Sequence, residues 1–147
     1  MNRLTAGILS VALMLTGMTA VAEQAQHFGD YTVHYSAFTT DILTPEVAKA
    51  YRIQRSKNRA LLNVSILKKV MGTTGQPVKA TVTGTATNLS AQLRQLDLRE
   101  LDEHGAIYYI AETPVNHEET LKYSLSILPE GETEPLSVSF DQQFFTH

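Results

Sequence analysis

The sequence contains no cysteine. Disulfides therefore cannot stabilise the fold, and no cysteine is present for lipid attachment after the apolar N-terminal stretch. Small exported domains need disulfides mainly when their hydrophobic core is too small, so here the core must supply the stability alone. A domain of this size buries roughly two thirds of its unfolded surface, which makes such a core feasible.

The sequence also lacks an apolar run long enough to span a membrane. The longest stretch, Leu4–Met18, is interrupted by polar residues and is shorter than the roughly 20 residues of a transmembrane helix. It follows Arg3 and precedes the small residues Ala20–Ala22, which is the pattern of a cleavable secretory signal. We therefore expect residues 1–22 to be a signal peptide and residues 23–147 to form one soluble domain, periplasmic or secreted after cleavage.

Positive charge is scarce in the expected mature chain. The sequence has 12 Lys and Arg against 15 Asp and Glu, and loss of Arg3 leaves 11 basic residues and a formal charge of −4. Nucleic-acid binding depends on clustered cations that neutralise phosphates. A mildly acidic exported chain is therefore not expected to bind nucleic acid.

Alternating apolar and polar residues dominate the rest of the chain. This period-two pattern predicts half-buried β-strands. The predicted strands cover residues 31–37, 60–67, 78–87, 93–101, 107–111, 121–127 and 136–140. Residues 24–27 are polar throughout and are predicted to be a leader, and Leu93 lies out of register with Leu96 and Leu98, which predicts a bulge in that strand.

One segment carries the signals of a helix. Thr44 suits the N-cap, Pro45 suits the first helical position, and Glu46 places an acid in the first turn. Residues 44–51 are therefore predicted to form one or two helical turns. About seven strands separated by turn signals, with one short helix after the first strand, predict an all-β fold, an immunoglobulin-like antiparallel β-sandwich.

Several short motifs resemble an uncharacterised family of secreted bacterial proteins, domain of unknown function 4426. The residues that carry the resemblance are Phe28–Phe38, Leu43–Ala48, Tyr51, Arg55–Ala60, Asn63–Ser65, Gly84–Asn88 and Ile107–Tyr109. The resemblance covers essentially the whole expected mature chain and implies an immunoglobulin-like sandwich. It implies no activity, because the family has none assigned, and it transfers no site residues.

Four cations stand within a short polar stretch between the predicted helix and the next strand. They are Arg52, Arg55, Lys57 and Arg59. Clustered guanidinium groups suit a carboxylate, a phosphate or an acidic protein surface. The alternative is a solvated connection whose arginine stems lie over apolar surface.

Tyr108 and Tyr109 are adjacent on a predicted strand, so their side chains must point to opposite faces of the sheet. One of the two should therefore lie outside the core, where it could contribute to a surface for a protein partner. The tail Phe144–His147 leaves two alternatives open: a strand end tucked into the sandwich, or an exposed apolar tag.

No catalytic, metal-binding or cofactor-binding constellation is recognisable. The histidines at positions 27, 34, 104, 117 and 147 form no local pair with metal-ligand spacing, and the chain has no G-x-S-x-G elbow. The acids Asp97, Glu100, Asp102 and Glu103 surround a predicted hairpin at 102–105 and are interpreted as solubilising edge charges. We therefore predict neither an enzyme nor a cofactor.

Three functional hypotheses remain. The preferred one is a non-enzymatic interaction module of the bacterial envelope, which contacts a protein partner through a sheet edge, the basic stretch or the tyrosine pair. The second is a binding protein for a small anionic ligand, held by residues 52–59. The third, an enzyme of unknown reaction, lacks support from any nucleophile, base or metal geometry.

Overall fold

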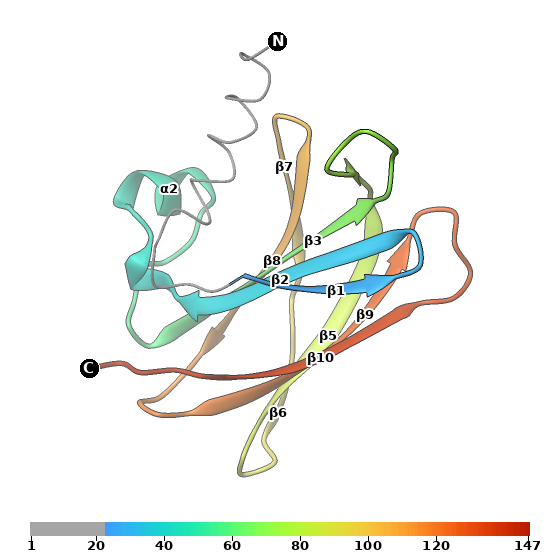
Figure 1. Ribbon diagram of the computed structural model, residues 1–147. Helices are drawn as coiled ribbons and strands as arrows, with labels where there is room; N and C mark the ends of the chain where they lie inside the picture. Colours follow the sequence, from blue (N-terminus) through green and yellow to red (C-terminus); the bar gives the residue numbers. More distant parts are fainter. Residues whose placement is uncertain (1–22) are drawn as a thin grey trace.

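The computed structural model describes residues 23–147, so the predicted signal peptide lies outside the described residues. Within residues 23–147, ten strands and two short helices follow one another, and Figure 1 shows their arrangement. Their order is β1 (Gln24–Phe28), β2 (Tyr31–Thr39), the 3-10 helix η1 (Thr40–Ile42), α2 (Pro45–Ala50), β3 (Arg59–Lys68), β4 (Gln76–Pro77), β5 (Ala80–Asn88), β6 (Leu93–Gln95), β7 (Arg99–Glu103), β8 (Ala106–Pro114), β9 (Thr120–Pro129) and β10 (Leu136–Gln143). No helix within residues 23–147 combines the length and hydrophobicity needed to cross a bilayer.

The strands form two antiparallel sheets. The first has the order β1-β2-β3-β8-β7, with β4 paired to β3, and the second has the order β10-β9-β5-β6. The two sheets pack face to face over one core, to which both contribute side chains (Figure 1). The predicted β-sandwich is confirmed.

The predicted leader and the predicted place of the helix are wrong. Residues 24–28 form the edge strand β1 rather than a leader, and their sequence gave no strand pattern because four of the five residues are exposed. The helix therefore follows the second strand instead of the first.

The predicted strand 93–101 is two strands, which belong to different sheets. Residues 93–95 pair with 85–87 of β5, whereas 99–103 pair with 106–110 of β8. The residues between them cross from one sheet to the other, and Leu96 and Leu98 pack against the core as they cross. The irregular spacing of Leu93 and Leu96 thus marks this crossing and not a bulge.

Apolar residues at every second position along the strands fill the space between the sheets. Fully buried examples are Leu62, Val64, Leu121 and Ile127. Phe140 lies between Tyr35 and Tyr123, with ring centroids 4.5 Å and 4.9 Å away. Phe144 is buried in the same core while Phe145 is 60% exposed, so the tail is tucked in at Phe144 and presents Phe145 to solvent.

A second apolar cluster covers part of the outer face of the first sheet. Phe38, Leu61 and Ile110 point away from the sandwich core and pack against Leu43, Val47, Ala48, Tyr51 and Ile53 from the helical segment. The helix begins as predicted, since the Thr44 hydroxyl accepts a hydrogen bond from the Val47 amide at 3.2 Å and Pro45 is its first residue. The helical segment therefore forms a third layer at one end of the sheet.

Candidate functional site

Three of the four cations predicted from the sequence, Arg52, Arg55 and Lys57, lie in the chain that joins α2 to β3, residues 52–58, which we call the basic connection. The fourth, Arg59, is the first residue of β3. The chain leaves the helix at Arg52, whose φ of 56° lies in the left-handed region. The amide of Ile53 donates to the carbonyl of Ala48 at 2.8 Å, and the Ile53 side chain is buried under the helix. A non-glycine residue keeps this conformation only where its surroundings hold it in place.

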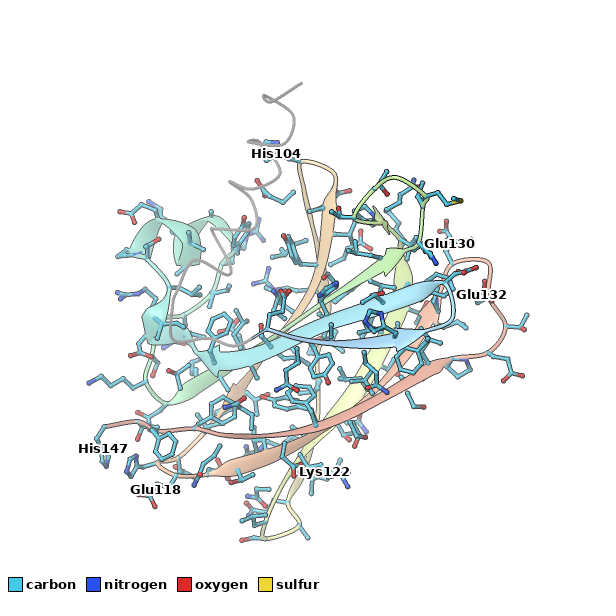
Figure 2. All side chains as sticks on the ribbon, in the orientation of Figure 1. His104, Glu118, Lys122, Glu130, Glu132 and His147 are labelled. Atoms are coloured by element: carbon cyan, nitrogen blue, oxygen red, sulfur yellow. The ribbon has the colours of Figure 1, made fainter. Side chains whose placement is uncertain are left out.

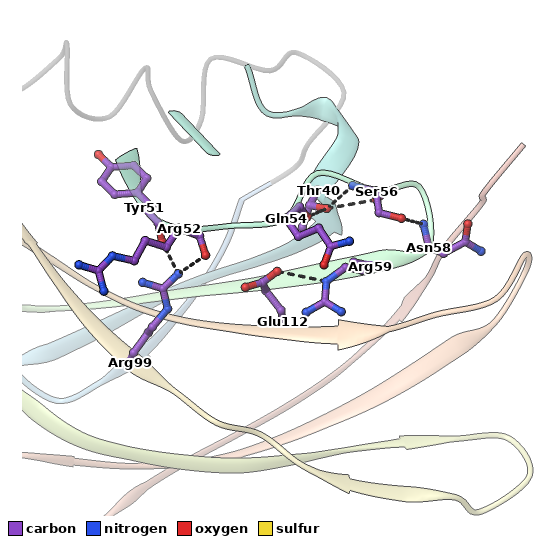
Figure 3. Close-up of polar contacts among 9 residues, drawn as sticks. All are labelled: Thr40, Tyr51, Arg52, Gln54, Ser56, Asn58, Arg59, Arg99 and Glu112. Carbon is purple, nitrogen blue, oxygen red and sulfur yellow. Dashed lines mark hydrogen bonds and ion pairs between the residues drawn. The ribbon is translucent and has the colours of Figure 1, made fainter. Parts of the chain in front are cut away.

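Thr40 anchors the basic connection from the side of the sheet. Its buried hydroxyl lies 2.7 Å from the carbonyl oxygen of Gln54 and 3.1 Å from that of Ser56, and it accepts a hydrogen bond from the Ser56 amide at 2.8 Å (Figure 3). A single side chain thus holds the loop at two residues, Gln54 and Ser56.

Replacing Thr40 with valine is expected to lower the free energy of unfolding by about 2 kcal/mol, because buried backbone groups lose their partner without a change in volume. Amide hydrogen exchange at residues 54–56 should also become faster. Thr39→Val is the matched control, since the Thr39 side chain caps nothing. Equal effects of the two substitutions would contradict the anchoring role of Thr40.

Two of the four predicted cations are engaged within the fold. Arg55 donates to the carbonyl of Leu43 at 2.7 Å and to that of Asp41 at 3.0 Å. Arg59 pairs with Glu112 on the neighbouring strand β8 at 3.2 Å (Figure 3). Arg55 therefore ties the basic connection to the segment before α2, and Arg59 ties β3 to β8.

Arg99, which the sequence analysis did not single out, holds the basic connection from the opposite side. It lies on β7 and donates to the carbonyls of Tyr51 and Arg52, at 3.3 Å in the case of Arg52 (Figure 3). No sequence pattern indicates this contact, because the partners are backbone atoms 47 and 48 residues away.

Arg52 and Lys57 remain exposed at the surface. Neither side chain forms an ion pair with another residue of the described part of the chain. The basic connection therefore presents two available cations on a backbone that Thr40, Arg55 and Arg99 hold rigid.

The structure separates the two predicted tyrosines. Tyr109 lies in the core, where its hydroxyl accepts from the Ala80 amide at 2.8 Å and donates to Glu100 at 3.0 Å. Tyr108 lies on the outer face beside the helical cluster and is half-buried. Only Tyr108 is available to contribute to a surface. The pKa of its hydroxyl is raised, mainly because the side chain is partly buried and secondly because the carboxylates of Glu23 and Glu103 lie nearby.

An open cleft of about 390 Å³ lies at the end of the sandwich where β9 turns into β10. Its lining includes the carboxylates of Glu100, Glu130 and Glu132, together with Lys79, which pairs with Glu100 at 3.4 Å. Figure 2 labels Glu130 and Glu132 at this turn. Glu100 is exposed on the edge strand β7, where the sequence analysis placed a solubilising charge, and it also accepts the hydrogen bond from Tyr109.

The histidines do not gather at one site, although two of them, His117 and His147, lie in contact. Figure 2 shows His104 at the tip of the β7–β8 hairpin and His147 at the far end of the sandwich. Within residues 23–147, no three His, Cys, Asp or Glu side chains group closely enough to hold a metal ion. His117 and His147 stack with ring centroids 3.9 Å apart, which is a packing contact between parallel rings.

Fold and surface together define a class: a β-sandwich whose outer face carries a short helical layer and a rigid basic connection. Residues 25–147 match the family described as "Domain of unknown function (DUF4426)", and the chain belongs to this family. The resemblance deduced from short motifs is thereby confirmed.

Solved structures share the fold. A DUF4426 family protein from Pseudomonas aeruginosa PAO1 is 38% identical, with a TM-score of 0.73 over 84% of this chain and 94% of that chain. FetP from uropathogenic Escherichia coli strain F11 is 12% identical, with a TM-score of 0.58 over 85% and 95%. Copper-reconstituted P19 from Campylobacter jejuni is 9% identical, with a TM-score of 0.56 over 84% and 94%. No curated protein sequence matches the chain.

Proposed function

We propose that the protein is a non-enzymatic interaction module of the bacterial periplasm, and that Arg52 and Lys57 of the basic connection contact an acidic protein partner. The observation that carries the proposal is that two of the four cations bind other groups of the fold and the other two do not. The side chains of Arg55 and Arg59 bind other groups of the fold, whereas those of Arg52 and Lys57 are exposed and form no ion pair with another described residue.

The rigidity of the basic connection supports a role in recognition. Arg52 is held at positive φ by its neighbours, and Thr40 binds the loop at Gln54 and Ser56. A loop that is already ordered loses little conformational entropy on association, so more of the interaction free energy appears as affinity. A merely solvated connection needs none of these contacts.

A periplasmic location is supported by the signal expected at residues 1–22 and by one of the fold neighbours, since FetP was expressed in the periplasm. Copper is bound in structures of FetP and P19. Their identities of 12% and 9% concern the fold alone, and residues 23–147 group no three potential metal ligands. We therefore do not extend copper binding to this chain.

The test is covalent capture in intact cells of an epitope-tagged full chain, followed by mass spectrometry of the bound proteins. The double variant Arg52→Ala/Lys57→Ala should lose at least about nine tenths of the partner, since loss of two interfacial charge contacts costs about 2 kcal/mol or more. Lys69→Ala/Lys122→Ala is the matched control, because both lysines are exposed and the net charge changes equally.

Binding of the captured partner to the purified protein should weaken as salt is added, since exposed charges are screened. Undiminished capture by the Arg52/Lys57 variant would refute the proposed surface. A rise in melting temperature with phosphate or citrate, lost in the same variant and unaccompanied by any captured protein, would favour the small-anion hypothesis instead.

A further inference from the structure

One edge of the second sheet is a long strand with almost no charge. Strand β10 is the outermost strand of this sheet, and among residues 23–147 only β9 pairs with it. It is eight residues long, and its single charged side chain is Asp141. Natural sheets usually protect such an edge with lysines, proline, a bulge or a very short strand, because its free backbone groups can pair with another chain. Between Leu136 and Gln143, β10 has none of these devices.

The other edge strands are better protected or shorter. At one edge of the first sheet, four of the five residues of β7 are charged. At its other edge, β1 has five residues, and β6 at the far edge of the second sheet has only three. Strand β10 is therefore the longest unprotected edge among the described strands.

The register of β9 and β10 shows which backbone groups of β10 point outward. The Phe144 amide donates to the carbonyl of Glu119 at 2.9 Å, so these opposite residues are a hydrogen-bonded pair that continues the antiparallel ladder. Such pairs occur at every second residue, so the even-numbered residues of β10 bond to β9. The amides and carbonyls of Ser137, Ser139 and Asp141 therefore point to the free edge, where no described backbone group bonds to them.

The residues with outward-pointing backbone groups are self-complementary. When two copies pair antiparallel about a twofold axis at Ser139, Ser139 faces its own copy and Ser137 faces Asp141 of the second copy. Each of these opposite pairs exchanges two backbone hydrogen bonds, and the Ser137 hydroxyl donates to the Asp141 carboxylate. The single charge of the strand thus meets a hydroxyl group instead of a second carboxylate.

Apolar side chains at the same edge are incompletely covered. Leu136 and Phe140 pack against the core but remain partly exposed, whereas Val138 between them is fully buried. A strand added to β10 extends the sheet and covers these side chains, since its own inward residues continue the core. In the register centred on Ser139, Phe140 lies opposite Val138 of the second copy.

We propose that the protein forms a homodimer through β10, in which the second sheets of two copies join into one antiparallel sheet about a twofold axis at Ser139. Because both copies use the same edge, the pairing closes at two copies. The basic connection joins α2 to a strand of the first sheet and is not part of this edge. The dimer therefore stands independently of the protein partner proposed above.

The test is sedimentation equilibrium of the purified protein over about a hundredfold range of concentration, since pairing of one edge buries a small area and gives a weak dimer. We expect the mass to rise from that of a monomer to that of a dimer and no further. Ser139→Lys should weaken dimerisation about tenfold, because two lysines then oppose each other at the axis. Ser124→Lys is the matched control, because Ser124 lies opposite Ser139 on β9, is also exposed and changes the net charge equally.

Two further variants test the register. Ser137→Lys should strengthen dimerisation about threefold, because its ammonium group lies opposite Asp141 of the second copy, and Asp141→Asn in the same chain should remove the gain. The sequence has no cysteine, so Ser139→Cys introduces a single thiol. A short bis-maleimide should join two Ser139→Cys subunits, whereas Ser124→Cys subunits, with the thiol one strand further from the axis, should stay separate.

A protein that remains monomeric over the whole concentration range would overturn the proposal. A dimer that Ser139→Lys and Ser124→Lys weaken equally would also overturn it, because the contact would then not lie at the free edge of β10. Tighter dimerisation of Ser139→Lys, or equal crosslinking from positions 139 and 124, would rule out a twofold axis at Ser139. None of these results bears on capture of a partner through Arg52 and Lys57.

Discussion

Gly84→Ala is expected to lower the free energy of unfolding by about 3 kcal/mol, because an added methyl group has no room in the core. A Cβ at this position would lie 2.6 Å from a methyl group of Leu125 and 2.7 Å from the carbonyl oxygen of Ser124. The second neighbour is backbone of β9, the paired strand, and cannot move without disturbing the ladder. Urea unfolding measures the loss.

Thr83→Ala is the control for this substitution. Thr83 precedes Gly84 on β5 and is exposed, so its replacement should change stability by no more than about 0.5 kcal/mol. Gly84 also accepts a hydrogen bond from the Leu96 amide at 3.0 Å, where the chain crosses between the sheets. A Gly84→Ala protein as stable as the wild type would show that β5 and β9 do not approach each other at Gly84 as closely as described.

Leu61→Ala is expected to cost about 3 kcal/mol, although Leu61 does not point into the core between the sheets. It is fully buried in the cluster beneath the helix. An outer-face residue of an ordinary antiparallel sheet would contribute little, so this substitution tests the helical layer itself. Differential scanning calorimetry and urea unfolding provide the measurement.

Ser65→Ala is the matched change on the same face of β3, outside the apolar cluster, and should be nearly neutral. Should both variants unfold at the same urea concentration, the helical segment would not be packed on the sheet. Loss of stability in Leu61→Ala alone supports the third layer.

The elements that depend on local pattern were predictable from the sequence. The alternation in β9 and β10 matches the buried positions of Tyr123, Leu125 and Val138, and the capping signals at Thr44 mark the true start of α2. Such features need only a few neighbouring residues to be recognised.

Features that depend on distant partners were not predictable. Strand β1 is an exposed edge, so it carries no apolar alternation. Residues 93–95 and 99–103 both read as strand from the sequence. They belong to different sheets only because 93–95 pair with β5 and 99–103 pair with β8. Period alone does not encode the identity of the partner strand.

In the candidate site, too, local patterns were predictable and contacts with distant residues were not. Charge density revealed the basic connection, but the roles of Arg55 and Arg59 depend on a carbonyl at Leu43 and on Glu112. Arg99 gave no signal at all, because it binds backbone atoms of a segment distant in the sequence.

The most direct test of the proposed function is site-specific photo-crosslinking in living cells from position 57. A photoreactive residue in place of Lys57 lies on the exposed part of the basic connection, whereas one in place of Thr83 lies on the outer face of the second sheet. The account predicts a crosslink from position 57 to an acidic segment of one periplasmic protein, and none from position 83. Crosslinks of equal yield from both positions, or from position 83 alone, would contradict it.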